Sequence, residues 1–231
     1  METGVVYQED CRETLKRLPD ESIDLVFADP FYVPPNMFDW KLFDDFYWGF
    51  NREWLTALKA KVKKTGHIFI SFSSEDMARF EMLLREVGYE SKSRVVWHYR
   101  NAGGRCRGGD RFGKTYEFIF HCSFGEPLNF PEKWDDKRFD VWTIAIPQSN
   151  FKEGKFHEFQ KPLELLERII LIGSKEGDLV YDPFAGSGTT CVAAEKHGRR
   201  WIASELKQEH SETTKRRALG ASNLMTSTHG V

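Results

Sequence analysis

The sequence is poor in cysteine and has no long hydrophobic run. Its four cysteines lie far apart, without a Cys-x-x-Cys pair, at Cys11, Cys106, Cys122 and Cys191. This pattern excludes a disulfide framework and offers no zinc-knuckle spacing, so we expect reduced, separately placed thiols. No apolar run reaches the roughly 18 residues of a membrane helix. Residues 1–10 lack the charged and then apolar build of a signal peptide. We therefore expect a soluble, cytoplasmic protein.

An excess of charge of one sign is also missing. The 231 residues include 33 Lys and Arg against 35 Asp and Glu, for a net charge of −2. A near-neutral chain does not coat nucleic acid by bulk charge, although it can still carry local basic patches that bind nucleic acid. With 40% hydrophobic residues, the chain is long enough for the core of one α/β domain, with or without a modest insert. Disorder is excluded for most of its length.

Strand-like and helix-like segments alternate along the chain, which predicts an α/β sheet with helices on both faces. The predicted strands cover 5–7, 23–28, 67–72, 95–99, 118–122, 178–181 and 201–204. The predicted helices cover 11–18, 55–62 and 76–87, and two more begin at Pro162 and Gly188. Prolines and mixed charges interrupt this rhythm at 124–156, which we interpret as a small insert or a recognition segment. The polar tail at 219–231 is expected to be flexible.

A strand, a glycine-rich turn and a helix follow one another near the C-terminus, and the turn reads Asp-Pro-Phe-Ala-Gly-Ser-Gly from Asp182 to Gly188. Glycines let a backbone approach a ligand, and the next helix N-terminus faces it. Cys191 replaces the third glycine of a dinucleotide motif, which argues against NAD. Glu205 ends the next strand, where an acid binds ribose hydroxyls. S-adenosylmethionine fits this pattern better than a dinucleotide.

The same residues also allow a plainer reading. Gly186 and Gly188 would then only form a tight turn, and Glu205 would only face solvent. The agreement of strand, loop, helix, second strand and terminal acid favours the cofactor site. Thr189 and Thr190 either contact the ligand or cap the helix, and capping is the reading that we prefer.

A second motif, Asp29-Pro30-Phe31-Tyr32, follows the apolar strand at 23–28. It stands at the carboxyl end of that strand, where α/β proteins bind ligands. An exocyclic amine needs acceptors for both N–H groups if its lone pair is to attack a methyl group. The Asp29 carboxylate and the Pro30 carbonyl supply them, and Tyr32 offers a flat face for a base. Alone this motif is an ordinary turn; together with the glycine loop it predicts a catalytic site.

With these two motifs the chain resembles the amino-type DNA methyltransferases, whose catalytic motif is Asp/Asn/Ser-Pro-Pro-Tyr/Phe/Trp. The catalytic loop precedes the cofactor loop, which is similar to the β group, a permuted form of the class I methyltransferase fold. Glu9-Asp10-Cys11 at the start, 159–163 and 198–205 are similar to further family motifs. One departure is Phe31 in place of the second proline. Both acceptors survive it, but the loop gains an N–H and loses rigidity.

The resemblance implies a Rossmann-like class I S-adenosylmethionine methyltransferase fold. Its catalytic half would cover 1–123, the recognition insert 124–156, the cofactor-binding half 157–218 and the tail 219–231. The catalytic residues would be Asp29, Pro30, Phe31 and Tyr32. The cofactor residues would be Asp10, Cys11, Asp29, Lys161, Asp182, Phe184, Gly186, Ser187, Gly188, Thr189 and Glu205, with Asp10 near the adenine and Lys161 near the cofactor carboxylate. Methyl transfer from a sulfonium needs no metal, and we assign none.

A basic, glycine-rich segment at 94–114 is the candidate DNA contact. It holds one acid, Asp110, and six cations: Arg94, Arg100, Arg105, Arg107, Arg111 and Lys114. A basic loop can follow phosphates in a protein that is not basic overall; the alternative is a solvated loop without a ligand. We assign DNA contact to the five cations at 100–114. Aromatic residues crowd 34–49 and usually belong to a core, but here we expect part of that segment to close over a flipped base.

We therefore expect an S-adenosylmethionine-dependent DNA methyltransferase that acts on an exocyclic amine of a flipped base. By resemblance, Asp rather than Ser at the first motif position favours adenine N6. Cytosine N4 is the alternative, amine methylation of RNA is a more distant one, and a dehydrogenase ranks lower still. A catalytically weak DNA-binding module is a rival of another class, for which Phe31 is the one sign. Homodimerisation and a cognate restriction endonuclease are partners that the resemblance implies.

Overall fold

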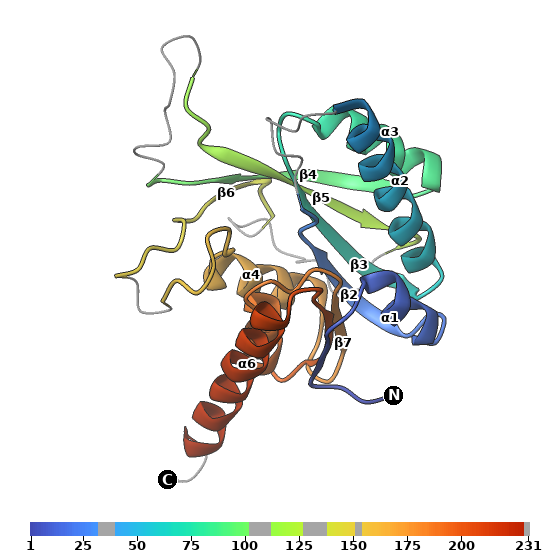
Figure 1. Cartoon of the computed structure of the whole chain (residues 1–231). Coiled ribbons are helices and arrows are strands. Elements are labelled where there is room, and N and C mark those ends of the chain that lie inside the picture. The colour runs from blue at the N-terminus through green and yellow to red at the C-terminus, as the bar shows by residue number, and fades with distance from the viewer. Residues whose placement is uncertain (32–39, 102–111, 127–137, 151–153, 229–231) are drawn as a thin grey trace.

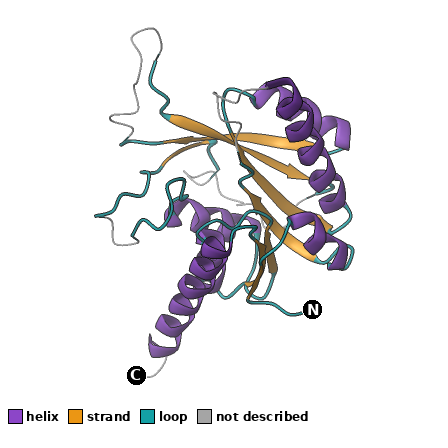
Figure 2. Cartoon of the chain, in the orientation of Figure 1, coloured by secondary structure: helices purple, strands orange, loops and turns teal. Residues whose placement is uncertain are grey.

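The computed structural model describes residues 1–31, 40–101, 112–126, 138–150 and 154–228, with the backbone alone at 40–43 and 222–228. These residues form one sheet with helices on both faces (Figures 1 and 2), which confirms the predicted α/β class. The strands are β1 (Val5–Tyr7), β2 (Ile23–Ala28), β3 (Val62–Phe72), β4 (Glu90–His98), β5 (Tyr116–Ser123), β6 (Val141–Thr143), β7 (Leu179–Asp182) and β8 (Arg200–Ser204). The helices are α1 (Cys11–Arg17), α2 (Trp40–Lys59), α3 (Met77–Val87), α4 (Leu163–Gly173), α5 (Thr189–Lys196) and α6 (Gln208–Thr228).

The sheet has the order β1-β8-β7-β2-β3-β5-β4-β6 in the described residues. From β1 to β3 all neighbours are parallel, whereas β5 is antiparallel to both β3 and β4. The carboxyl ends of β1, β8, β7, β2 and β3 therefore share one edge with the beginning of β5. We call this the site edge, because parallel α/β sheets bind ligands beyond the carboxyl ends of their strands.

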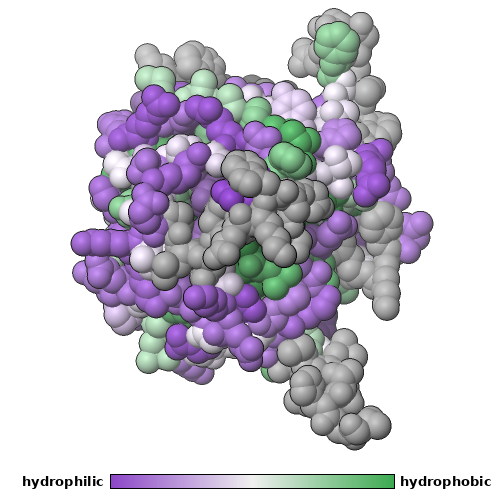
Figure 3. Space-filling model, turned by 180° about the vertical axis from the view of Figure 1, so that it is seen from behind, coloured by the Kyte–Doolittle hydropathy of each residue, from purple (hydrophilic) through white to green (hydrophobic). Residues whose placement is uncertain are grey.

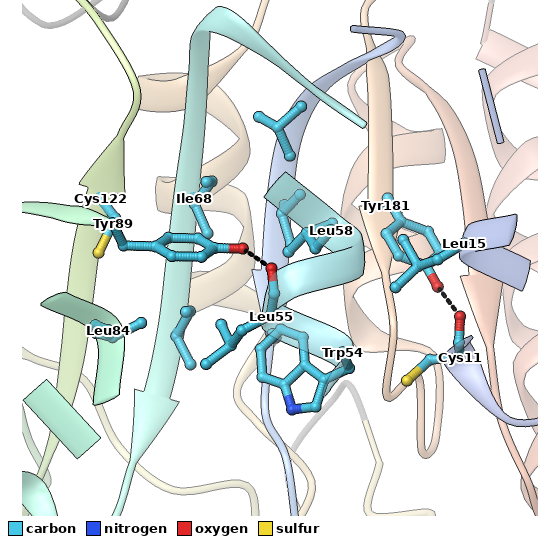
Figure 4. Close-up of a cluster of buried hydrophobic side chains, with 14 of the residues drawn as sticks. Cys11, Leu15, Trp54, Leu55, Leu58, Ile68, Leu84, Tyr89, Cys122 and Tyr181 are labelled. Atoms are coloured by element: carbon cyan, nitrogen blue, oxygen red, sulfur yellow. Dashed lines mark hydrogen bonds between the residues drawn. The ribbon is translucent and has the colours of Figure 1, made fainter. Parts of the chain in front are cut away.

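Two hydrophobic clusters cover the two faces of the sheet. Along β2, Val26 and Ala28 pack with α1, α2 and α3, while Leu25 and Phe27 pack with α4, α5 and α6. This alternation is the strand period of two, and burial on both faces explains why 23–28 is almost continuously apolar. Figure 4 shows part of the first cluster, where the Tyr89 hydroxyl donates to the Leu55 carbonyl at 2.7 Å.

The predicted helix at 55–62 is wrong at both ends. Helix α2 begins at Trp40 and ends at Lys59, and Val62 already belongs to β3. Lys63, Lys64 and Gly66 resemble a helix end in the sequence, but they lie in the strand, where the pairing with β2 jumps from Val62 to His67. The irregular pairing with β2 has overridden the local helix-stop signal.

Two more elements lie where the sequence indicated none. Strand β6 falls within 124–156 and pairs with β4, so part of the expected insert is the edge strand of the sheet. Helix α6 extends to Thr228 and so runs through most of the expected tail. Other boundaries are confirmed: α3 ends at Val87 and is capped by Gly88, which adopts the left-handed conformation with φ 87°, and Pro162 is the N-cap of α4.

The helices, the surface and the cysteines of the structure can be compared with what the composition predicted. Within the described ranges, the structure has no helix long and apolar enough to cross a bilayer. Hydrophilic side chains cover most of the face in Figure 3, and hydrophobic ones gather there in small patches. The three described cysteines, Cys11, Cys122 and Cys191, are buried and unpaired with one another.

Candidate active site

Four acidic residues from distant parts of the sequence meet at the site edge. Asp10 follows β1, Glu205 follows β8, Asp182 ends β7, and Asp29 follows β2. Because these strands are parallel neighbours in the order β1-β8-β7-β2, their carboxyl ends lie side by side. The topology thus assembles the predicted cofactor and catalytic motifs in one place.

The cofactor loop after β7 is organised by Asp182. One carboxylate oxygen accepts the Phe184 N–H at 2.9 Å, and the side chain of Thr190 also bonds to this carboxylate. Burial raises the pKa of Asp182 to about 7, against the opposing effect of these hydrogen bonds. The buried carboxyl group of Asp182 therefore stabilises the turn through its hydrogen bonds with Phe184 and Thr190.

Gly186 and Gly188 both have positive φ, 53° and 78°. A Cβ on Gly186 would meet no atom closer than 4.0 Å, so open space lies over this residue. A Cβ on Gly188 would lie 2.7 Å from the side chain of Thr214 in α6. The first glycine leaves room beside the loop, and the second lets α6 pack directly behind it.

Helix α6 holds the back of the cofactor loop, a contact that sequence reasoning missed. Arg217 donates to the Ser187 carbonyl at 2.5 Å and to the Thr189 hydroxyl at 3.3 Å. The Thr214 hydroxyl donates to the Gly186 carbonyl at 3.2 Å. The buried face of α6 is made of small residues, so the sequence shows no hydrophobic periodicity from which this helix could be predicted. Of the two readings for the threonines, capping does not apply, because Gly188 is the N-cap of α5.

Glu205 points its carboxylate at the glycine loop. One oxygen accepts the Gly186 N–H at 2.8 Å, the other accepts the Lys207 N–H at 2.8 Å, and His210 lies 3.6 Å away. The side chain is only 11% exposed. A held carboxylate next to the loop is the acceptor that a ribose diol requires.

Asp10 and Cys11 begin α1 at the same edge. The Asp10 carboxylate caps the helix by accepting the Arg12 N–H at 2.9 Å and forms an ion pair with the Arg12 guanidinium at 2.7 Å. The Cys11 side chain lies in the core, where burial raises the pKa of its thiol to about 12. Figure 4 shows its carbonyl accepting from the Tyr181 hydroxyl at 3.5 Å. The thiol therefore stays protonated and is not a nucleophile.

Asp29, the first residue of the catalytic motif, forms an ion pair with Lys161 (Oδ2 to Nζ, 2.8 Å). The same ammonium contacts Glu117 Oε2 at 3.0 Å. Burial works against the charge of Lys161, but the two carboxylates outweigh it and raise its pKa. Sequence reasoning found Lys161 but not this pairing. It missed Glu117. The sequence feature that could have indicated this residue is its position as an acidic side chain near the start of an apolar strand.

Phe31, which replaces the second motif proline, packs against α2. Its ring centroid lies 5.4 Å from that of Tyr47, edge to face, and 5.5 Å from that of Phe50. Phe50 in turn contacts Phe184 of the cofactor loop at 6.1 Å. A row of rings thus connects the two loops. Pro30 is buried, and Tyr32 lies outside the described residues.

The candidate DNA contacts are described only in part. Arg100 is exposed and donates to the Thr143 carbonyl at 3.4 Å; Lys114 donates to the Ser73 hydroxyl at 3.4 Å. Arg94, which the basic segment included, lies in β4 and forms an ion pair with Glu81, so it is not part of a loop. Outside the described residues lie Arg105, Arg107 and Arg111.

The described aromatic side chains of the segment at 34–49 differ in their burial. Tyr47 and Trp48 lie in α2 and are buried in the first core cluster, so the part of the segment expected to close over a base does not include these two residues. Phe46 is 61% exposed. Residues 34–39 lie outside the described part of the chain.

The chemistry of this edge fits S-adenosylmethionine. Open space over Gly186 admits a ligand against the loop, Glu205 offers a carboxylate for hydroxyls, and the N-terminus of α5 faces the same side. Asp29 stands on the neighbouring strand, where an acceptor for an amine is needed. A nucleoside cofactor and a second substrate can therefore meet between β7 and β2.

Known proteins resemble this chain over most of its length. A sequence profile described as DNA methylase, of the N6/N4 type, matches residues 23–216. The Type II methyltransferase M.HinfI of Haemophilus influenzae is 30% identical over 93% of this chain and 68% of its own. The DNA adenine methyltransferase YhdJ of Escherichia coli K12 is 30% identical over 94% of this chain and 83% of its own.

Solved structures agree in fold. The M1.HpyAVI–SAM complex superposes with a TM-score of 0.73 and 25% identity, over 92% of this chain and 98% of that one. The PvuII DNA methyltransferase, described as cytosine-N4-specific, gives a TM-score of 0.77 over 98% of this chain and 94% of its own. At 21% identity, this second likeness concerns the fold alone.

Proposed function

The chain belongs to the N6/N4 DNA methylase family, and on that premise we propose that it methylates N6 of an adenine that is flipped out of the DNA duplex. Methyl transfer from S-adenosylmethionine to DNA is the activity of the family. The acceptor atom and the flipped base are the parts that we add.

The observation that carries the proposal is the position of Asp29. Its carboxylate follows β2 directly, is held by Lys161 at 2.8 Å, and shares the site edge with the glycine loop. An acceptor in this place binds one N–H of an incoming amine, and the Pro30 carbonyl is the candidate for the other. Both bonds withdraw the amine from ring conjugation and direct its lone pair.

The base must leave the stack, because an amine inside the duplex is paired and out of reach. When bound, S-adenosylmethionine would supply a methyl group from a sulfonium, and the sulfonium would become a neutral thioether as the nitrogen–carbon bond forms. The methylated nitrogen would then lose one proton to solvent water. The negative charge of Asp29 stabilises the positive charge that develops on this nitrogen. Tyr32 is the proposed stacking residue.

The cofactor side uses the residues around the glycine loop. Glu205 is proposed to bind the ribose hydroxyls. Asp10, which follows β1 and caps α1, is proposed to lie near the adenine, as the resemblance implies. Phe184 is a neighbour of Phe50 and Trp54, with centroids 6.1 and 5.2 Å apart, so the loop is supported by α2. Together these residues would hold S-adenosylmethionine beside Asp29.

Adenine is favoured by two observations. The motif begins with Asp, and a relative that is 30% identical over 94% of the chain is named a DNA adenine methyltransferase. M.HinfI, equally similar, is named a Type II methyltransferase, so a cognate restriction endonuclease is a proposed partner. A homodimer is a further expectation, which sedimentation of the purified protein tests.

Mass spectrometry of the product tests the proposal. The protein is incubated with mixed-sequence DNA and isotopically labelled S-adenosylmethionine, and the DNA is digested to nucleosides. We expect labelled N6-methyladenine. Labelled N4-methylcytosine contradicts the base assignment. Label in RNA but not in DNA, or in neither, contradicts the proposed activity.

A further inference from the structure

We infer that Lys161 and Glu117 position the Asp29 carboxylate and set the charge of the catalytic site, and that Lys161 does not serve as a ligand of the cofactor. The inference rests on the proposed role of Asp29 as the amine acceptor. It assigns a task to Glu117, which no motif singles out, and a different task to Lys161.

The three side chains form one buried cluster. The Lys161 ammonium lies 2.8 Å from Asp29 Oδ2 and 3.0 Å from Glu117 Oε2, and the side chains are 8%, 19% and 13% exposed in that order. Charge-assisted bonds of this length in a buried site are directional. One oxygen of the Asp29 carboxylate is therefore tied to the ammonium, which fixes the carboxylate relative to the strand end.

Asp29, Glu117 and Lys161 are positioned by three different elements of the fold. Asp29 follows β2, and Glu117 is the second residue of β5, whose antiparallel direction brings its beginning to the site edge. Lys161 precedes Pro162, the N-cap of α4. The indole ring of Trp97 lies beside the ammonium, with its centroid 5.8 Å from Nζ.

The charges of the cluster explain why a second carboxylate is needed. Lys161 alone would neutralise Asp29, and a neutral pair stabilises a developing positive charge on the amine only weakly. With Glu117 included, two carboxylates and one ammonium leave one net negative charge. Burial raises the pKa of Glu117, but Lys161 reverses that effect and the net shift is downward. Glu117 therefore stays ionised around neutral pH.

Other charged and titratable groups face the cluster and belong to the same electrostatic environment. Tyr99 donates to Glu117 Oε1 at 3.2 Å, and the charge of Lys114 acts on Glu117. The groups that feel the charge of Asp29 are Tyr47, His157 and Asp182. Lys161 is in direct contact with Asp29, at 2.8 Å.

The variant Lys161→Met tests the inference through the pH dependence of methyl transfer. Without the ammonium, two buried carboxylates face each other, and like charges resist ionisation. In single-turnover measurements at saturating DNA and cofactor, we expect the acid limb of the rate profile to move up by about one pH unit or more. The dissociation constant for S-adenosylmethionine, measured by calorimetry, should change less than about threefold, well under one tenfold step of 1.4 kcal/mol.

The variant Glu117→Gln gives a second readout and keeps the shape of the side chain. We expect the methyl-transfer rate at neutral pH to fall by about tenfold or more, because the cluster loses its net negative charge, with unchanged cofactor binding. In Lys161→Met/Glu117→Gln the acid limb should return toward its wild-type position, since the repulsion is gone. Lys196→Met is the matched control, because Lys196 forms an ion pair with Glu167 at the far end of α5.

Three results would overturn the inference. The first is an unmoved acid limb in Lys161→Met. The second is a loss of cofactor affinity in that variant without a change in the profile, which would make Lys161 a cofactor ligand. The third is a wild-type rate in Glu117→Gln. Circular dichroism and thermal melting verify folding. A failure of the proposed function is distinguishable, because the wild-type protein itself would then transfer no methyl group to DNA.

Discussion

At the scale of single residues, Phe31 stands where a second proline would restrain the catalytic loop. Its ring packs on Tyr47 and Phe50, and so connects the loop to α2. We expect Phe31→Ala to lower the single-turnover rate by about tenfold, since small displacements of reacting groups are costly. Its side chain is 45% exposed, so the melting temperature should change little.

Leu171→Ala is the control for Phe31→Ala, because Leu171 is 53% exposed on α4, away from the site edge. It should leave both rate and melting temperature unchanged. A wild-type rate in Phe31→Ala would show that the ring contacts do not hold the loop.

Asp182 is a second residue with a measurable signature. Its pKa, about 7 in the folded protein, lies above the ordinary value of 3.8. Between these pH values the folded protein holds a proton that the unfolded chain has released. The free energy of unfolding therefore falls as pH rises, by up to about 1.4 kcal/mol per pH unit from this group. Asp182→Asn lacks this loss, so its stability relative to wild type should grow from pH 4 to 7 and then level off.

Urea denaturation at several pH values measures that difference. Leu171→Ala is the control, since Leu171 is 53% exposed and its side chain carries no titratable group. The difference in stability between this variant and wild type should stay flat across the same pH range. A flat difference for Asp182→Asn as well would refute the effect of burial on this carboxyl group.

The residues of the site were predictable to the extent that each stands in a local motif. Asp29, Asp182 and Glu205 follow apolar strands in the sequence, and the structure has them at one edge. Glu117 was not predictable, because its place depends on β5 running antiparallel to β3, which no local pattern encodes. The ion pair between Lys161 and Glu117 was missed for the same reason.

At the scale of elements, α6 supports the cofactor loop from behind through Thr214 and Arg217. Gly188→Ala tests this contact, because its Cβ would lie 2.7 Å from Thr214 in addition to the strain of a φ of 78°. We expect a loss of about 2–4 kcal/mol in the free energy of unfolding and weaker binding of S-adenosylmethionine.

Gly177→Ala separates the two causes. Gly177 has a φ of 81° with no atom within 4 Å of a Cβ, so its substitution costs only the backbone strain, about 1–2 kcal/mol. Urea denaturation of both variants gives the difference. Equal losses of unfolding free energy in the two variants would mean that α6 shifts away from the added Cβ without a measurable loss of stability.

Elements with an apolar period were predictable, and those without one were not. The predicted strand at 23–28 matches β2, whose side chains are buried on both faces. Helix α6 buries Ser211, Thr214 and Ala218, which have a helical spacing but no hydrophobic signal. The start of α2 was missed although Tyr47, Trp54 and Leu58 follow a helical period, because the aromatic residues were assigned to a different role.

At the scale of the whole molecule, a net charge of −2 conceals an uneven distribution. Arg94 is neutralised by Glu81, while Arg100 is exposed near the beginning of the basic segment. We expect modest DNA affinity with strong salt dependence, concentrated on the side of the site edge.

Binding isotherms at several salt concentrations test this expectation. Arg100→Ala should lower the slope of log K against log salt by about 0.9 if one phosphate contact is lost. Lys16→Ala is the control, since Lys16 pairs with Glu13 in the last turn of α1. An unchanged slope in Arg100→Ala would exclude this residue from the DNA contact.

The most direct test of the account is the single-turnover rate of Asp29→Ala, measured beside the affinity for S-adenosylmethionine. We expect a loss of methyl transfer of about 10²-fold or more, because the amine loses its charged acceptor. The variant should still fold and bind the cofactor within about fivefold of wild type, less than 1 kcal/mol. A wild-type rate in this variant would contradict the assignment of Asp29 as the acceptor.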